Sequence, residues 1–180
     1  MDKSSAIAMR TAVAAVPVPA RPGTYALLLN VARRQRITVG RLGALAAAQG
    51  FYLYTGSAFG PGGLRARLRH HLGTPHRLHW HIDYLRRIAV PCEIWYSDDR
   101  NSSEHVWAGI CAGLAGASIP LRRFGASDCD CDAHLFHFKT PPDFAAFEKH
   151  FAPAAAPRRK IHRVTDIATA MPDVLQRRRT

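Results

Sequence analysis

Short apolar stretches separated by polar turns dominate the first third of the chain. Residues 24–31 are apolar and include β-branched and aromatic members, which predicts a buried strand. A short strand is expected at 37–40 and another at 51–54, whereas the alanine-rich stretch between them is ambiguous. Because these three strands follow one another closely, they can pair as an antiparallel meander. Further strands are expected at 93–97 and 134–139.

Helical spacing of apolar residues marks the segments that follow. Leu64, Leu68 and Leu72 recur every four residues, which places them on one face of a helix. Helices are expected at 64–72, 80–88, 103–114 and 141–151. The mixture of strands and helices predicts an α+β fold.

The chain has 180 residues, enough for one domain with a hydrophobic core and short for two. Residues 1–20 hold an alanine-rich run that Arg10 interrupts, which predicts a flexible arm rather than a signal peptide. Residues 21–152 carry the expected elements and form the expected domain. Residues 153–180 combine alanine, proline and arginine, which predicts a basic tail with one helical turn near Val174.

The formal net charge of +12 favours a polyanionic partner, nucleic acid before all others. An anionic membrane surface is the competing partner, and a structural RNA binder would carry the same charge. No apolar stretch is long enough to span a bilayer, so we expect no membrane partner and a cytoplasmic protein. The four cysteines are then expected to be reduced thiols.

Two tripeptides place tyrosines at the ends of predicted strands: Gly23-Thr24-Tyr25 and Tyr54-Thr55-Gly56. A phenol can donate to a phosphate oxygen, or accept a proton where its pKa is lowered. On the helix at 64–72, Arg67 and His71 flank the apolar line, where a half-shielded guanidinium suits a phosphate. Each residue alone also has a structural explanation, because strand tyrosines pack and arginine stems cover a core.

Glu104 opens a predicted helix, and its carboxylate is a ligand for a hard divalent cation. The alternative is a capping box in which Asn101 caps the helix and Glu104 lies three residues later. His79 and Asp83 form a second polar cluster, as a metal pair or as a hydrogen-bonded structural pair.

Cys129, Cys131 and His134 supply three zinc-type ligands in an aspartate-rich loop. Their spacing is not that of a standard zinc finger, and a fourth ligand for Zn²⁺ would have to come from elsewhere in the chain. The other interpretation is that the two cysteines are reduced structural thiols, and from the sequence we prefer it to a zinc site.

The ordered set of these residues resembles the GIY-YIG nuclease superfamily. Gly23-Thr24-Tyr25 and Tyr54-Thr55-Gly56 are similar to its two motifs, Arg67 to its helical arginine, and Glu104 to its metal-binding glutamate. The phrases GFYLYTGSAFGPGGLRARLRHHL, LHWHIDYL and FGASDCDC resemble the DUF123 branch of GIY-YIG-like proteins. This resemblance covers residues 21–140 and implies a small, mainly antiparallel sheet of three central strands flanked by helices.

The resemblance also implies a metal-dependent endonuclease that hydrolyses phosphodiester bonds in nucleic acid, with DNA as the expected substrate. Glu104 would hold Mg²⁺ or Mn²⁺ and Tyr25 would be the general base, assisted through a hydrogen bond by Tyr54. Arg67 would stabilise charge on the phosphorus, and His71 would shuttle a proton or contact phosphate.

Three further arginines are expected to bind the nucleic-acid backbone, namely Arg65, Arg69 and Arg77. Two alternatives to an endonuclease stay open. One is a non-catalytic nucleic-acid-binding module with the same fold. The other is a zinc-stabilised interaction domain around Cys129, Cys131 and His134.

Overall fold

A computed structural model of the chain describes residues 17–73, 77–151 and 160–172. The helical turn expected near Val174 and residues 1–16 of the expected arm lie outside the described residues. None of the helices within the described ranges is long and apolar enough to cross a membrane.

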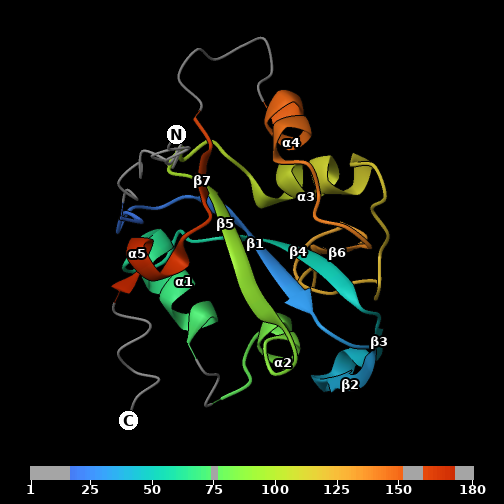
Figure 1. Ribbon diagram of the computed structural model, residues 1–180. Helices are drawn as coiled ribbons and strands as arrows, with labels where there is room; N and C mark the ends of the chain where they lie inside the picture. Colours follow the sequence, from blue (N-terminus) through green and yellow to red (C-terminus); the bar gives the residue numbers. More distant parts are fainter. Residues whose placement is uncertain (1–16, 74–76, 152–159, 173–180) are drawn as a thin grey trace, which may run out of the picture.

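A five-stranded antiparallel sheet in the order β6-β4-β1-β5-β7 forms the centre of the fold (Figure 1). The middle strand β1 (Thr24–Val31) lies between β4 (Gly50–Ser57) and β5 (Val90–Ser97). The edge strands are β6 (Leu135–Phe138) and β7 (His162–Val164). The central β1 is apolar on both faces because helices cover the sheet on both sides.

The α+β class agrees with the sequence prediction, but the expected three-stranded sheet is wrong in its number of strands. β6 and β7 extend the three central strands at both edges. β7 comes from the segment at 153–180 that we assigned to a basic tail. Its Arg163 donates two hydrogen bonds to the carboxylate of Glu93 on β5, at 2.9 and 2.8 Å, which ties β7 to the sheet.

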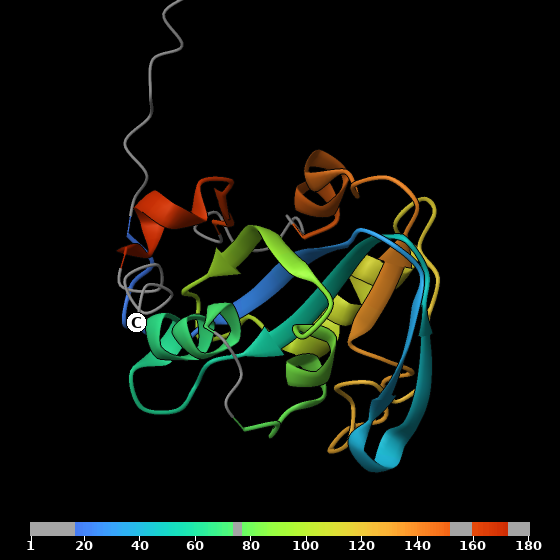
Figure 2. The same ribbon diagram turned by 60° about the horizontal axis from the view of Figure 1, so that its bottom comes forward.

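The expected three-strand meander is also wrong, because β2 (Gln35–Val39) does not pair with β1. Instead β2 pairs with β3 (Gly43–Ala47) in a separate two-stranded sheet. A short 3₁₀ turn, Gly40–Leu42, connects β2 and β3. Its first residue Gly40 and the following Gly43 have φ values of 46° and 104°, a backbone region that favours glycine. The hairpin projects beyond one end of the main sheet (Figure 2). Its strand β2 contacts α2, and buried apolar residues of the hairpin belong to the main core.

Helices on the two faces of the sheet enclose two cores. α1 (Gly63–Leu72), α2 (His81–Leu85) and the short α5 (Ile167–Ala170) cover one face (Figure 1). α3 (Glu104–Gly113) and α4 (Phe144–Phe151) cover the other. Two of the expected helices are shorter in the structure. The helix expected at 80–88 spans only His81–Leu85, and the helix expected at 141–151 begins at Phe144, after two prolines.

Candidate functional site

The two tyrosine tripeptides meet on neighbouring strands. Tyr25 of β1 lies opposite Gly56 of β4, and Tyr54 lies opposite Leu27, so both tyrosines project from the same face. Their ring centroids are 6.5 Å apart. A Cβ atom on Gly56 would lie 2.5 Å from the Tyr25 hydroxyl oxygen. Glycine at this position therefore makes room for the Tyr25 ring.

The residues before Tyr25 position the start of α3. A Cβ atom on Gly23 would lie 2.2 Å from the carbonyl oxygen of Ser97, so β1 and β5 approach closely here. The hydroxyl of Thr24 donates to the carbonyl of Ser102 at 2.7 Å. This buried hydrogen bond fixes the segment that leads into α3 and thereby the position of Glu104.

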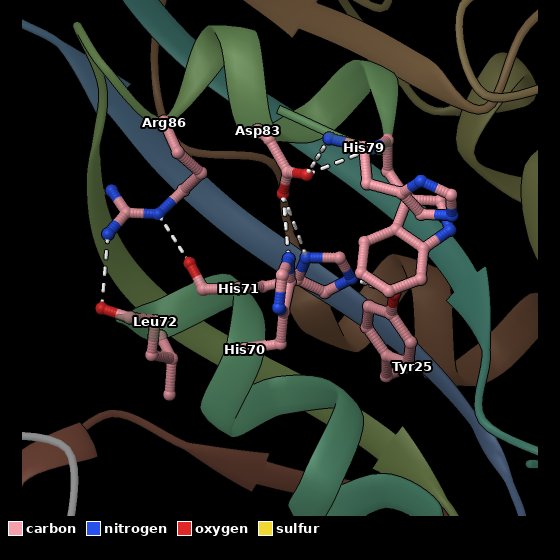
Figure 3. A network of polar contacts seen from close by, with 8 residues as sticks. Tyr25, His70, His71, Leu72, His79, Asp83 and Arg86 are labelled. Carbon is pink, nitrogen blue, oxygen red and sulfur yellow. Dashed lines mark hydrogen bonds and ion pairs between the residues drawn. The ribbon is translucent and has the colours of Figure 1, made fainter. Parts of the chain in front are cut away.

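A buried histidine connects Tyr25 to an aspartate on α2 (Figure 3). The hydroxyl of Tyr25 lies 2.8 Å from Nε2 of His71, which is on the last turn of α1. Nδ1 of His71 faces the carboxylate of Asp83 at 3.8 Å and has no hydrogen-bond partner among the described residues. Because Nδ1 faces a carboxylate, we assign the ring hydrogen to Nδ1, so that Nε2 accepts from Tyr25.

Backbone amides at the start of α2 hold the carboxylate of Asp83. The amides of His79 and Trp80 both donate to its Oδ2 at 2.9 Å, and the ring of His70 contacts Oδ1 at 3.2 Å. The hydrogen-bonded alternative for His79 and Asp83 is therefore the one found, although the bond comes from the backbone of His79. The sequence did not place Asp83 beside His71, because a loop separates α1 from α2.

Burial sets the protonation of this group. It lowers the pKa of His71 to about 4, against an ordinary value of 6.5. Burial also raises the pKa of Tyr25 well above 10, with the nearby Tyr54 adding to the effect. Burial acts to raise the pKa of Asp83, but His71 and the backbone amides outweigh it and lower that pKa to about 2. At neutral pH the tyrosine and histidine are uncharged and the aspartate is ionised.

Arg67 lies half-buried one turn before His71, stacked on an indole. Its guanidinium carbon is 4.4 Å from the centroid of the Trp80 ring, a cation–π contact. The Trp80 ring also packs edge-on against His71, with the ring centroids 5.5 Å apart. A shallow cavity of about 200 Å³ adjoins this stack and is lined by Arg67, His70, Trp80, Gly60 and Pro61 among others. The described residues thus include a cation in the lining of this cavity.

Glu104 is the first residue of α3, and Ser103 is its N-cap, accepting from the amide of His105 at 3.2 Å. The capping box with Asn101 is therefore wrong, since Glu104 lies one residue after the cap rather than three. Burial, followed by the charge of the Glu104 carboxylate, raises the pKa of Tyr54. For Tyr25, burial and Tyr54 are the larger causes of the raised pKa, and Glu104 adds a smaller increase. Within the described ranges it forms no hydrogen bond or ion pair.

The three arginines expected to bind a backbone are all exposed. Arg65 and Arg69 lie on α1, and Arg77 precedes α2. The Nε of Arg65 donates to the carbonyl of Val18 at 2.9 Å, so this side chain also holds the segment before β1.

The loop residues Cys129 and Cys131 lie close to His134, as their spacing suggested, and His105 completes the group. His105 was not among the ligands predicted from the sequence. Its only signal was its position directly after Glu104, at the start of a predicted helix.

Comparison with known proteins gives one family. No curated protein and no solved structure matches the chain significantly. The model of the family described as "Domain of unknown function DUF123" matches residues 24–155. This range includes Thr24 and Tyr25 of the first tripeptide, the whole of the second tripeptide, α1, α3 and the cysteine loop. Because this match covers more than half of the sequence, the chain belongs to the DUF123 family.

Proposed function

We propose that this protein is a metal-dependent phosphodiesterase that cuts nucleic acid, with DNA as the expected substrate. The observation that carries the proposal is the buried line from Tyr25 through His71 to Asp83 (Figure 3). Arg67 lies beside this line, stacked on the Trp80 ring that packs against His71. Such a line pairs a hydroxyl with a base and the base with an orienting carboxylate. The resemblance to GIY-YIG nucleases also supports the proposal of a nuclease activity.

In the proposed reaction Tyr25 relays a proton from the attacking water to His71. Tyr25 takes a proton from the attacking water while its own hydroxyl proton passes to Nε2 of His71, 2.8 Å away. The neutral imidazole becomes an imidazolium that carries hydrogens on both nitrogens. The ionised carboxylate of Asp83 stabilises that charge across the 3.8 Å gap to Nδ1. His71 thus lets a tyrosine of raised pKa act as a base without accumulating phenolate charge.

Access to this line comes from the side of Tyr54. Tyr25 is 1% exposed and Tyr54 is 7% exposed. Burial raises the pKa of Tyr54 and keeps its hydroxyl protonated, so it can donate a hydrogen bond to a water or a phosphate oxygen. Tyr54 therefore orients the water, which agrees with the assisting role that the resemblance implies.

Arg67 supplies the positive charge for the substrate. Its guanidinium fork can donate two hydrogen bonds to phosphate oxygens, and its stacking on Trp80 limits the conformations of the side chain. The exposed arginines Arg65, Arg69 and Arg77 would bind flanking phosphates, which makes binding depend on salt.

Glu104 fits a divalent cation of the Mg²⁺ or Mn²⁺ type. Its half-buried carboxylate has no hydrogen bond or ion pair within the described residues, so its oxygens are available as ligands. Mg²⁺ is commonly held by one or two carboxylates together with substrate phosphates and water. When bound, the cation would polarise the phosphate and stabilise the leaving oxygen.

A cleavage assay tests this proposal. Wild-type protein is incubated with duplex, branched and single-stranded DNA and with RNA, in Mg²⁺ or Mn²⁺. We expect Tyr25→Phe, His71→Gln, Arg67→Ala and Glu104→Gln each to lower the cleavage rate by about 100-fold or more.

Matched controls exclude general damage to the protein. Glu148→Gln on α4 and Arg87→Ala after α2 replace exposed residues of the same types and are expected to cut at the wild-type rate. The proposal is refuted if wild type cuts none of these substrates with either metal, or if the four site variants cut as fast as the controls.

One observation favours a second candidate, a module of the same fold that binds nucleic acid without cutting it. The hydroxyl of Tyr25 is buried and bonded to His71, as in a purely structural contact. This candidate predicts salt-sensitive DNA binding by wild type, no cleavage, and unchanged binding in Tyr25→Phe.

A further inference from the structure

Four metal-ligating side chains from separate parts of the chain gather beside the first turn of α3. One ligand atom from each of them lies within 4.8 Å of every other. His105 belongs to α3, Cys129 and Cys131 to the loop that follows Gly125, and His134 directly precedes β6. Two thiols and two imidazoles are a common ligand set for tetrahedral zinc.

Two sulfur–nitrogen distances within the group match those expected around a zinc ion. Sγ of Cys129 lies 3.5 Å from Nε2 of His134, and Sγ of Cys131 lies 3.5 Å from Nδ1 of His105. Zinc bonds of about 2.3 Å to sulfur and about 2.0–2.1 Å to nitrogen, at tetrahedral angles, separate a sulfur from a nitrogen by about 3.6 Å. The side chains therefore need only small movements to enclose an ion.

Contacts outside the ligands hold the loop in this shape. The guanidinium of Arg123 donates to the carbonyl of Cys129 at 2.6 Å and to that of Cys131 at 3.1 Å. Arg123 itself has a φ of 64°, which is uncommon for a residue other than glycine. The amide of His134 donates to the carbonyl of Phe124 at 2.8 Å. The backbone thus presents all three loop ligands toward His105.

The ligand set would also balance the charge of a zinc ion. A Zn²⁺ ion bound to two thiolates and two neutral imidazoles has no net charge, which suits a partly buried site.

We propose that His105, Cys129, Cys131 and His134 bind a structural Zn²⁺ ion, with His105 as the fourth ligand that the sequence analysis could not find. The ion joins the first turn of α3 to the loop and to the start of β6. Because Glu104 precedes His105, the ion also fixes the helix turn that carries Glu104. The inference goes beyond the proposed phosphodiesterase function and holds whether or not the protein cuts nucleic acid.

Metal analysis of the whole protein tests the inference. Protein purified with a reductant and without chelator is expected to contain one zinc ion per chain by mass spectrometry. His105→Ala and Cys129→Ser should lower the zinc content at least about tenfold. Two matched controls should keep it, namely Cys92→Ser on β5 and His150→Ala on α4, which replace the same residue types outside the group.

Cobalt substitution identifies the ligands even where a variant folds poorly. Co²⁺ in wild type should give thiolate charge-transfer bands and the intense visible bands of tetrahedral coordination. The His105→Cys variant retains a fourth ligand, so it should keep its zinc and show stronger charge-transfer absorption. Removal of zinc from wild type by a chelator should lower the urea concentration at which half of the protein unfolds.

Two results would overturn the inference. One is wild-type protein that contains no zinc and that shows no thiolate charge-transfer bands when Co²⁺ is added. The four side chains would then be joined only by two S–H···N hydrogen bonds. The other is equal zinc content in wild type and in a variant that lacks both Cys129 and Cys131.

Discussion

The burial of His71 predicts how the stability of this protein depends on pH. In the folded chain the ring is 1% exposed, and burial lowers its pKa from 6.5 to about 4. In the unfolded chain the ring is hydrated and binds a proton below pH 6.5. Between these two values the unfolded state binds more protons than the folded state, so the free energy of unfolding falls as the pH falls.

The size of this loss follows from the difference between the two pKa values of His71. A tenfold change in a proton-binding constant corresponds to about 1.4 kcal/mol. From pH 6.5 to about 4, the contribution of His71 to the free energy of unfolding therefore falls by about 3 kcal/mol. Well above pH 6.5 the ring is neutral in both states and contributes no pH dependence. Asp83, with a folded pKa of about 2 against 3.8, loses its stabilising contribution only at still lower pH.

The His71→Gln variant isolates this contribution. Glutamine is neutral and of similar reach, so it can still accept a hydrogen bond from Tyr25. Urea unfolding followed by tryptophan fluorescence gives the free energy of unfolding of both proteins across the range from pH 6.5 to about 4. We expect wild type to lose about 3 kcal/mol more than the variant over this range.

Other histidines do not obscure the comparison, because both proteins contain them. His150→Gln, at an exposed position on α4, is the matched control and should follow the wild-type curve. Parallel curves for wild type and His71→Gln would refute the reasoning. They would mean that His71 is hydrated in the folded protein and that the proposed line from Tyr25 is not buried.

Three further predictions concern neighbouring contacts. Gly56→Ala places a Cβ atom 2.5 Å from the Tyr25 hydroxyl and should displace it from His71. Cleavage should fall at least about tenfold while the fold survives, as checked by rates and circular dichroism. Arg86→Met removes the hydrogen-bond donor to the carbonyls of the last two residues of α1. It should lower the free energy of unfolding, measured in urea, by about 3 kcal/mol, and a loss of less than about 1 kcal/mol would contradict this role. Arg163→Ala should cost at most about 1 kcal/mol yet speed hydrogen exchange in β7, and unchanged exchange would contradict the tie to β5.

The pattern of apolar and polar residues predicted most elements, because it records which parts of each segment are buried. It placed β1, β4 and α1 and thereby positioned Tyr25, Tyr54 and Arg67. It did not predict that β6 and β7 extend the sheet, nor that β2 and β3 leave it. Strand order depends on contacts between segments far apart in the chain, which periodicity does not record.

The sequence by itself identified the candidate residues for the proposed chemistry: two tyrosines beside glycines, an arginine and a histidine on one helix, a glutamate at a helix start, and a cysteine pair. Only the tertiary structure decided their partners. Asp83 reaches His71 because α2 packs on the same face of the sheet as α1, and His105 reaches the cysteines because α3 begins beside their loop. The sequence specifies which chemical groups are present and how they are spaced along the chain. The packing of whole helices and strands brings groups from distant segments within bonding distance.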